Sequence, residues 1–260
     1  MAAAVASVPK ISYATFQKVY FAMGRAIEVK VNPKASIPAY LIKLNFGAAL
    51  DGEHNKLYKK SNYGSSAQLC SKHKADEITN QLMLAVLNFP RKQIGTMMSD
   101  CLVTGVQRDT VMQDEKRAST VFMTCSSEVD PGSRVGILGE EQVIQTNPRE
   151  LSWGDFLKLD LRIGTISECT NCSKIADSLN RVMLKVNLGS VGEKVCVAVL
   201  NESVDSESLK GKQVLILTNL DDESKKTLFE TTDFYGVVCT VNGMALVQPK
   251  IPVENGYKLA

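Results

Sequence analysis

The order of apolar and polar side chains along the chain predicts short β-strands separated by loops. In residues 19–30 apolar and polar positions alternate, which is typical of a strand that buries one face. A polar segment of helical character, residues 71–80, stands between the third and fourth expected strands. The expected strands of this region are residues 19–30, 40–46, 65–70, 82–88 and 101–106.

The same succession occurs a second time in the chain. Ile11-Ser12-Tyr13-x-x-Phe16-x-Lys18 recurs 140 residues later as Leu151-Ser152-Trp153-x-x-Phe156-x-Lys158. Three shorter matches follow in the same order: Gly24-x-x-x-Glu28 with Gly164-x-x-x-Glu168, Asn45-Phe46-Gly47 with Asn187-Leu188-Gly189, and residues 81–89 with residues 212–220. Because the offset changes only between matches, as insertions in loops would cause, we interpret the chain as a tandem duplication.

Each copy has the strand order of an OB barrel. Five short strands with one short helix between the third and the fourth are the plan of this Greek-key fold. We therefore expect an all-β protein of two tandem OB-fold barrels. The expected ranges are residues 11–136 for the first domain, 137–150 for a linker and 151–260 for the second domain. In the second copy Asn242-Gly243 predicts a two-residue hairpin of type I′, which the first copy replaces with a charged insertion, expected to be a loop.

Composition and charge agree with this plan and distinguish the two copies. A chain of 260 residues with 44% hydrophobic and 22% charged side chains is typical of a soluble globular protein of about two domains. The formal net charge is only +2, but residues 1–140 carry +5 and residues 141–260 carry −3. The first copy is therefore the better electrostatic partner for a polyanion such as RNA.

The sequence shows no pattern that indicates catalysis, a cofactor or a metal site. Five of the seven cysteines lie in or beside apolar runs, which is typical of reduced thiols packed as small hydrophobic groups. Cys169-Thr-Asn-Cys172 is a lone CxxC without the second ligand pair that zinc needs. No segment resembles a secretory signal or is long enough to span a bilayer. We expect a cytoplasmic protein that is not an enzyme, needs no cofactor and does not contact a membrane.

Several motifs connect the chain with the tRNA-binding OB-fold family. The first copy resembles the CsaA secretion chaperones of that family in Pro33-Lys34-Ala35-x-x-Pro38-Ala39-Tyr40, Asn45-Phe46-Gly47, Ser65-Ser66-Ala67-Gln68-Leu69, Asn88-Phe89-Pro90-Arg91-Lys92-Gln93-Ile94-Gly95 and Met98-Ser99-Asp100-x-Leu102-Val103. The second copy is similar to the C-terminal tRNA-binding modules of some methionyl-tRNA synthetases, a yeast synthetase cofactor and endothelial monocyte-activating polypeptide. Its motifs are Trp153-x-x-Phe156-x-Lys158-x-Asp160-Leu161-Arg162-Ile163-Gly164-Thr165, Ala176-Asp177-Ser178-Leu179 and Leu209-Lys210-Gly211-Lys212.

This resemblance implies tRNA as a ligand, and an aminoacyl-tRNA synthetase or a multi-synthetase complex as a protein partner. Arginine and lysine can hold phosphate groups, and hydroxyl and amide groups can bond phosphate, ribose or base edges. The candidate RNA contacts are Lys59, Lys60, Ser65, Gln68, Asn88, Arg91, Lys92, Gln93 and Ser99 in the first copy and Lys158 and Arg162 in the second. The structural alternatives are a solvated loop for Lys59 and Lys60, a cap of its own turn for Asn88, and a turn closure for Ser99.

The other conspicuous side chains are expected to be structural. We expect the rings of Phe16, Phe46, Phe89, Trp153 and Phe156 to fill the barrels rather than to stack on bases. His54 and His73 lie in polar segments and are expected to be solvated.

The two copies depart from the family pattern in different ways. The first copy has Tyr20 and Ala22 where the family has aspartate and arginine, whereas the second keeps Asp160 and Arg162. In the second copy, the loop after the fourth strand begins with three acidic residues, 221–223, which would repel RNA at moderate salt. We therefore expect RNA contacts mainly in the first copy, with the second as its partner in an intramolecular pseudo-dimer, or with further copies in a homo-oligomer.

A second hypothesis is a protein-interaction module with little RNA binding of its own. Such a module would be a CsaA-like chaperone, or a scaffold subunit of a synthetase or ribonucleoprotein complex. The acidic second copy and the missing charges of the first copy favour this alternative.

Overall fold

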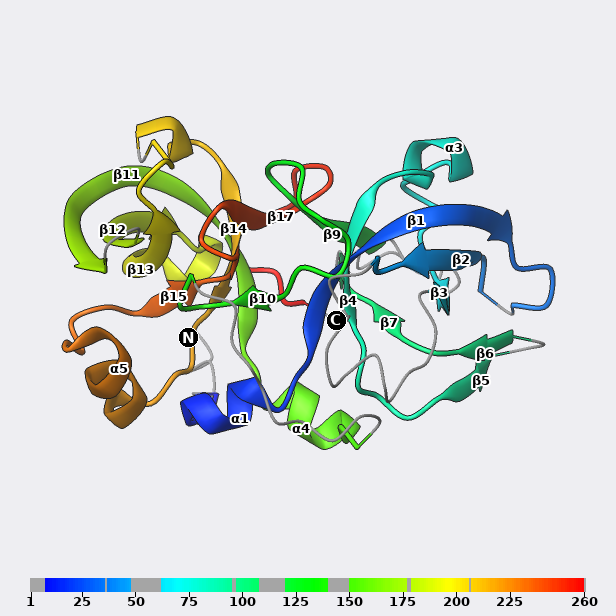
Figure 1. Ribbon diagram of the computed structural model, residues 1–260, viewed down its shortest axis with the longest axis horizontal. Coiled ribbons are helices and arrows are strands. Elements are labelled where there is room, and N and C mark those ends of the chain that lie inside the picture. Colours follow the sequence, from blue (N-terminus) through cyan, green and yellow to red (C-terminus); the bar gives the residue numbers. More distant parts are fainter. Residues whose placement is uncertain are drawn as a thin grey trace, which may run out of the picture.

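The computed structural model describes residues 8–35, 37–47, 62–94, 97–107, 120–139, 150–176, 179–205 and 207–259. Strands are the predominant regular structure in these residues, and two barrels lie side by side (Figure 1). The prediction of an all-β protein with two OB-type barrels is confirmed. The candidates Lys59 and Lys60, together with His54 and nearly all of the charged insertion at 107–119, lie outside the described residues.

The first barrel is built on a five-stranded sheet in the order β3-β2-β1-β4-β7. Its strands are β1 (Phe21–Val31), β2 (Tyr40–Asn45), β3 (Asn62–Ala67), β4 (Leu82–Val86) and β7 (Leu102–Val103), with the short helix α3 (Ala75–Ile78) between β3 and β4. The amide of Val103 donates to the hydroxyl oxygen of Ser65 over 3.3 Å. The amide of Asp100 donates to the carbonyl of Gly64 over 2.8 Å. These contacts join β3 to the chain around β7 and complete the barrel.

In both copies, a close steric approach explains why the repeated Gly-x-x-x-Glu motif begins with glycine. In the first barrel the buried Phe46 ring meets Tyr63 edge to face, with the ring centroids 5.1 Å apart. A Cβ atom at Gly24 would lie only 2.6 Å from that Phe46 ring, and one at Gly164 would lie 2.5 Å from Cγ1 of Val186. Only glycine therefore lets the first strand of each copy cross directly over the side chains that fill the barrel.

We expect Gly24→Ala to destabilise the protein by about 1–3 kcal/mol, because the added methyl group overpacks the barrel against Phe46. Thermal or urea unfolding measures the change. Gly136→Ala is the matched control, because a Cβ there meets no atom of the described residues within 4 Å. Equal unfolding free energies for the two variants would contradict this explanation of the repeated glycine.

The second barrel is closed and has the strand order β11-β12-β13-β15-β14. Its strands are β11 (Leu161–Ala176), β12 (Leu179–Asn187), β13 (Glu193–Asn201), β14 (Gln213–Leu217) and β15 (Gly236–Val238); a 3-10 turn, η2 (Gly189–Val191), joins β12 to β13. The helix expected between the third and fourth strands is the 3-10 turn η3 (Glu207–Leu209). The predicted Asn-Gly hairpin is confirmed, because Asn242 and Gly243 have φ values of 49° and 67° between β16 (Thr240–Val241) and β17 (Ala245–Pro249).

The acidic segment after β14 is a helix, not the loop that we expected. Helix α5 (Asp222–Phe229) begins after Asp221, whose carboxylate accepts the amide of Ser224 over 2.8 Å. Acidic residues in the first turn and a lysine in the last turn both favour the helix dipole. The acidic residues that suggested repulsion of RNA therefore also start a helix.

A third sheet contains strands from both copies and joins the barrels. Its order is β10-β16-β17-β9-β8, where β8 is Gly105–Gln107, β9 is Thr120–Cys125 and β10 is Val135–Gly136. Strands β9 and β17 are antiparallel, with Cys125 opposite Val247 and Met123 opposite Pro249. In Figure 1 these strands lie between the barrels. The two copies therefore share main-chain hydrogen bonds as well as side-chain contacts.

The apolar core between the barrels is formed by the outer faces of the first and fourth strands of each copy. The first copy contributes Phe21, Met23, Leu82, Leu84 and Val86, and the second contributes Leu161, Ile163, Leu215 and Leu217. All of these side chains are buried. The rings of Phe16 and Phe156 also lie in this cluster, so they fill the contact between the barrels. The expectation that they fill a barrel interior is wrong. Phe46 does lie inside its barrel.

The segments before the first strands are exchanged between the copies. Residues around α1 (Tyr13–Gln17) contact the second barrel, where the amide of Ile11 donates to the carbonyl of Asn219 over 2.9 Å. Residues around α4 (Trp153–Leu157) contact the first barrel, where the amide of Leu151 donates to the carbonyl of Asn88 over 3.1 Å. The matching contacts agree with a duplicated module that is packed as an intramolecular pair.

The structure also explains how the first copy tolerates the absence of the family's aspartate and arginine. In the second copy Asp160 is buried and lies 2.9 Å from Nε of Arg162 and 2.7 Å from Nζ of Lys258. At the matching place in the first copy, the Arg134 guanidinium lies 3.8 Å from the ring centre of Tyr20. A cation–π contact thus stands where the second copy has an ion pair.

Two further expectations about side chains are wrong. His73 is not solvated, because it is only 5% exposed and its ring lies 4.8 Å from that of Phe122, centre to centre. Burial accordingly lowers the pKa of His73 below its ordinary value. Trp153 does not fill a barrel, because 52% of it is exposed on α4.

Within the described parts of the chain, no three histidine, cysteine, aspartate or glutamate side chains are grouped so that they could hold a metal ion. No helix in these parts is both long and apolar enough to cross a membrane. The first residues of the expected linker pack against the barrels, since Ile137 is fully buried in the core between them. Residues 140–149 lie outside the described residues, and the exact domain limits stay a prediction.

Candidate nucleic-acid interface

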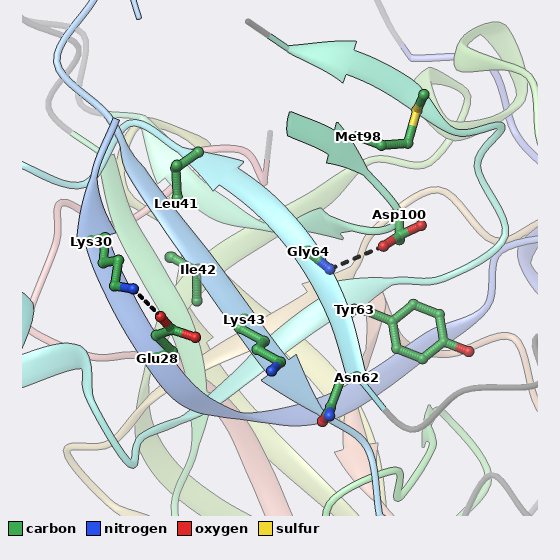
Figure 2. Close-up of a pocket in the computed structure, with 10 residues that line it drawn as sticks. All are labelled: Glu28, Lys30, Leu41, Ile42, Lys43, Asn62, Tyr63, Gly64, Met98 and Asp100. Atoms are coloured by element: carbon green, nitrogen blue, oxygen red, sulfur yellow. Dashed lines mark hydrogen bonds and ion pairs between the residues drawn. The ribbon is translucent and has the colours of Figure 1, made fainter. Parts of the chain in front are cut away.

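A pocket of about 370 Å³ lies on the outer face of the first barrel, over strands β1, β2 and β3 (Figure 2). An OB barrel presents its ligand-binding face on its second and third strands and on the loops beside them. The pocket lies on that face. Its lining residues are Glu28, Lys30, Leu41, Ile42, Lys43, Asn62, Tyr63, Gly64, Met98 and Asp100.

Charged side chains on two neighbouring strands form one side of the pocket. Lys30 forms an ion pair with Glu28 on β1, and Lys43 is exposed on β2 (Figure 2). The hydrogen bond from Lys30, its charge and the charge of Lys43 lower the pKa of Glu28. The two ammonium groups can contact phosphate groups, while Asn62 at the rim offers an amide that can bond ribose or a base edge.

A hairpin from the loop after the fourth strand forms the opposite side. Strands β5 (Lys92–Ile94) and β6 (Met97–Ser99) pair with each other, and the chain then reaches Asp100. The Asp100 carboxylate accepts the amide of Gly64 over 3.2 Å and lies 2.8 Å from Nε of Arg91. This nearly buried carboxylate fastens the hairpin to β3 and holds Arg91 at its base. The exposed side chains of Lys92 and Gln93 follow directly.

Three candidate contacts in the first copy point away from this surface. Ser65 is 1% exposed, and its hydroxyl oxygen accepts the amide of Val103. The Ser99 hydroxyl donates to the carbonyl of Cys101 over 2.9 Å. The Asn88 amide group donates to the carbonyl of Lys18 over 2.6 Å and accepts the amide of Tyr20 over 3.0 Å. The polar groups of these three residues therefore bond to the protein itself and do not face the pocket. Gln68 is half-buried just after β3.

The two candidates in the second copy are both engaged by acidic residues. Lys158 is exposed at the end of α4, with its Nζ 2.7 Å from Oδ1 of Asp155. Arg162 is largely buried, and it donates to Asp160 and to the carbonyl of Gly256. Arg162 therefore connects the start of β11 with the C-terminal segment around Gly256, whereas Lys158 lies on the surface.

The outer face of the second barrel differs in chemistry from that of the first. Lys43 on β2 corresponds to Lys185 on β12, which pairs with Glu168 over 2.5 Å. On the third strands, however, the outward positions Gly64 and Ser66 of β3 correspond to Val195 and Val197 of β13. The first copy thus exposes a small and polar strand where the second has an apolar one.

In the second barrel, helix α5 and the chain that follows it cover this apolar face. Arg181 on β12 donates to the carbonyl of Phe229, and the amide of Tyr235 donates to the carbonyl of Val195 over 2.7 Å. Lys225 lies on the buried side of α5, and its Nζ donates to the carbonyl of Phe234 over 2.8 Å. Burial lowers the pKa of this lysine. The face that is open in the first barrel is therefore partly covered in the second, where Val197 is buried but Val195 is still 38% exposed.

Several residues of the pocket were missed by the reasoning from sequence. Side chains along a strand point alternately inward and outward, and Lys30 and Lys43 occupy outward positions. Strand periodicity could therefore have identified both as exposed. Asp100 stands within one of the motifs of the resemblance, but its role depends on contacts with Gly64 and Arg91 that no local pattern reveals.

Comparisons with known proteins agree with the resemblance found in the sequence. No protein-family model matches the chain. A methionine–tRNA ligase of Methanococcoides burtonii is 44% identical over 70 residues, which are 27% of this chain and 10% of that protein. One from Porphyromonas gingivalis is 36% identical over 111 residues, which are 40% of this chain and 16% of that protein. The chain therefore spans less than a sixth of these two relatives.

Solved structures similar to the chain include a CsaA chaperone and the C-terminal domain of a p43 protein. A CsaA chaperone protein from Picrophilus torridus is 30% identical and covers 48% of this chain and 97% of its own, with a TM-score of 0.38. The C-terminal domain of Plasmodium vivax p43 is 15% identical and covers 76% of this chain and 98% of its own, with a TM-score of 0.43. The matches to methionine–tRNA ligases confirm the resemblance to this tRNA-binding group that the sequence indicated.

Proposed function

We propose that the chain is a non-catalytic tRNA-binding accessory protein, a cofactor or scaffold for aminoacyl-tRNA synthetases, that binds RNA mainly through its first barrel. The observation that carries this proposal is the contrast between the two outer faces. The first barrel has an open pocket with Lys30 and Lys43, whereas α5 and the chain after it cover part of the corresponding face of the second barrel. The relatives named methionine–tRNA ligases support tRNA as the ligand and a synthetase as the partner.

The proposed surface consists of the outer face of β1 to β3 together with the β5–β6 hairpin. Its cationic members are Lys30, Lys43, Arg91 and Lys92. Because Arg91 is held by Asp100, the hairpin presents its charges in a fixed position rather than on a free loop. Such a surface recognises the backbone and shape of RNA more than its sequence.

The second candidate function is binding of unfolded or partner proteins, which the exposed apolar side chains of Trp153 and Leu157 favour. The two functions respond differently to salt, because phosphate contacts release counterions and apolar contacts do not.

We expect total tRNA to bind the full chain in filter-binding assays. Affinity should fall roughly 40-fold between about 50 and 200 mM salt if three phosphate contacts form. The same preparation should be tested for suppression of aggregation of an unfolded protein. Suppression that is insensitive to salt, without measurable tRNA binding at the lower salt concentration, would favour the chaperone-like function and refute the RNA proposal.

A further inference from the structure

Helix α4 presents two large apolar side chains to solvent. Trp153 and Leu157 are four residues apart and therefore lie on one face of the helix. Trp153 is 52% exposed and Leu157 is 59% exposed. Trp153 is also the only tryptophan of the chain. An exposed pair of this kind indicates a contact surface rather than a structural role.

The indole ring of Trp153 has a rigid support. Its centre lies 5.4 Å from that of Phe89 in the first copy and 5.4 Å from that of Phe156 on its own helix. The hydroxyl oxygen of Ser152 accepts the amide of Asp155 over 3.0 Å and caps the helix. The indole is thus backed by aromatic rings from both copies, and the rest of its surface is open.

Basic residues stand near Trp153 and Phe89 along the chain. Phe89 stands two residues before Arg91 and three before Lys92, so the RNA-binding loop proposed above begins beside the indole. Lys158 follows the last residue of α4. The pKa of the Asp155 carboxyl is lowered mainly by hydrogen bonds from Lys158 and Ser152, and to a smaller extent by the charge of nearby Lys18.

In the other half of the molecule the matching place is half-buried and lies against α5. Tyr13 on α1 corresponds to Trp153, and its amide donates to the hydroxyl oxygen of Ser224 on α5 over 2.8 Å. Burial raises the pKa of Tyr13 to about 12. There the neighbouring loop is the acidic start of α5, residues 221–223, whereas the loop beside Trp153 is basic. The two places therefore differ both in cover and in the sign of the neighbouring charge.

We propose that Trp153 is a stacking platform for an unpaired nucleobase of RNA, so that the RNA surface of the first barrel continues onto α4 of the second copy. The inference rests on the proposed function, which supplies the RNA. Stacking on an indole accepts any base, and the lysines and arginine beside it suit the flanking phosphates. The second copy then takes part in RNA binding through its helix, although the ligand face of its barrel is partly covered.

The single tryptophan makes the test direct. The full chain is titrated with total tRNA and with a single-stranded oligonucleotide while the tryptophan emission is followed, and free N-acetyltryptophanamide corrects for absorption by the RNA. We expect saturable quenching of Trp153 at the concentrations at which filter binding saturates. Trp153→Ala should weaken binding by about 5- to 100-fold, whereas Trp153→Phe should keep most of the affinity. Thermal unfolding of each variant checks that the fold is intact.

The outcomes separate this proposal from the function on which it rests. If tRNA binds but neither quenches Trp153 nor loses affinity in Trp153→Ala, the stacking platform is refuted and the RNA function stands. If tRNA does not bind at all, both fail. A peptide of residues 221–230, which include the helix beside Tyr13, serves as the protein probe. Quenching by this peptide and not by RNA would overturn the stacking platform in favour of a helix-binding surface.

Discussion

Alanine at Lys30, Lys43 and Lys92 together is expected to weaken tRNA binding by roughly a hundredfold, at about 1 kcal/mol for each lysine replaced. The slope of log affinity against log salt should fall by about three, because each lysine that contacts a phosphate releases about one counterion. These side chains are exposed around the first-barrel pocket and its hairpin, so their removal leaves the core intact. Arg91 is left in place because it also anchors the hairpin through Asp100. Filter binding over a salt series measures both quantities.

The matched control removes the same charge from the second barrel, at Lys210, Lys212 and Lys226. These lysines lie outside the proposed surface, and we expect a much smaller decrease in affinity with an unchanged fold. If this control lowered the affinity for tRNA as much as the first-barrel variant does, binding would depend on net charge alone. The assignment of the RNA surface to the first barrel would then be wrong.

Asp160→Ala is expected to destabilise the protein by about 3 kcal/mol, or roughly 6–12 °C in the midpoint of thermal unfolding. The Asp160 carboxylate is buried and accepts hydrogen bonds from Arg162 and Thr218, and it pairs with Lys258. Its removal leaves the largely buried Arg162 without its acidic partner. The position also joins β11 to the C-terminal segment, so the substitution should weaken the second barrel as a whole.

The effect of Asp160 should depend on pH in a definite direction. Burial alone would raise the pKa of this carboxyl, but the hydrogen bonds from Arg162, Lys258 and Thr218 lower it below its ordinary value. The stabilisation is therefore complete above the unfolded-state pKa of about 4 and is lost as the pH falls through the lower folded-state value. Unfolding at pH 7 and in acid should show a difference between wild type and Asp160→Ala that shrinks in acid.

Asp155→Asn is the control for this prediction. The Asp155 carboxyl also has a lowered pKa, because Lys158 and Ser152 bond to it, but it lies at the surface. We expect little change in stability there, since solvent screens the pair. A larger destabilisation at Asp155 than at Asp160 would mean that burial does not decide the strength of these contacts.

The parts of the fold that depend on local chemistry were predictable from the sequence. The pattern in residues 19–30 predicted strand β1, although residues 21–24 are buried on both faces because this half of the strand also packs between the barrels. Asn242-Gly243 predicted the tight hairpin between β16 and β17. The glycines at 24 and 164 marked the repeat because the same steric need recurs in each barrel. Each of these signals is contained within a few neighbouring residues.

The site was less predictable because its members are brought together by contacts between distant segments. Ser65 and Ser99 were expected to face RNA, but polarity alone does not show that a hydroxyl bonds the backbone inside a barrel. The exposure of Trp153 depends on the absence, on its side of the molecule, of a helix like the one beside Tyr13. No periodicity within the copy that carries Trp153 contains that information.

The exchanged segments impose an order on how the chain can fold during synthesis. Ile11 is made before the strands of either barrel, yet the backbone groups that it pairs with belong to Asn219 and Asp221, after the fourth strand of the second barrel. The same holds for β9, whose partner β17 is also made late. The first barrel can form its interior on the ribosome, but one apolar face and one strand edge stay open until the second barrel emerges. Completion of the fold is thus a late event. A chain stopped before β14 would leave the apolar face and the strand edge of the first barrel exposed, and it would aggregate or bind a chaperone.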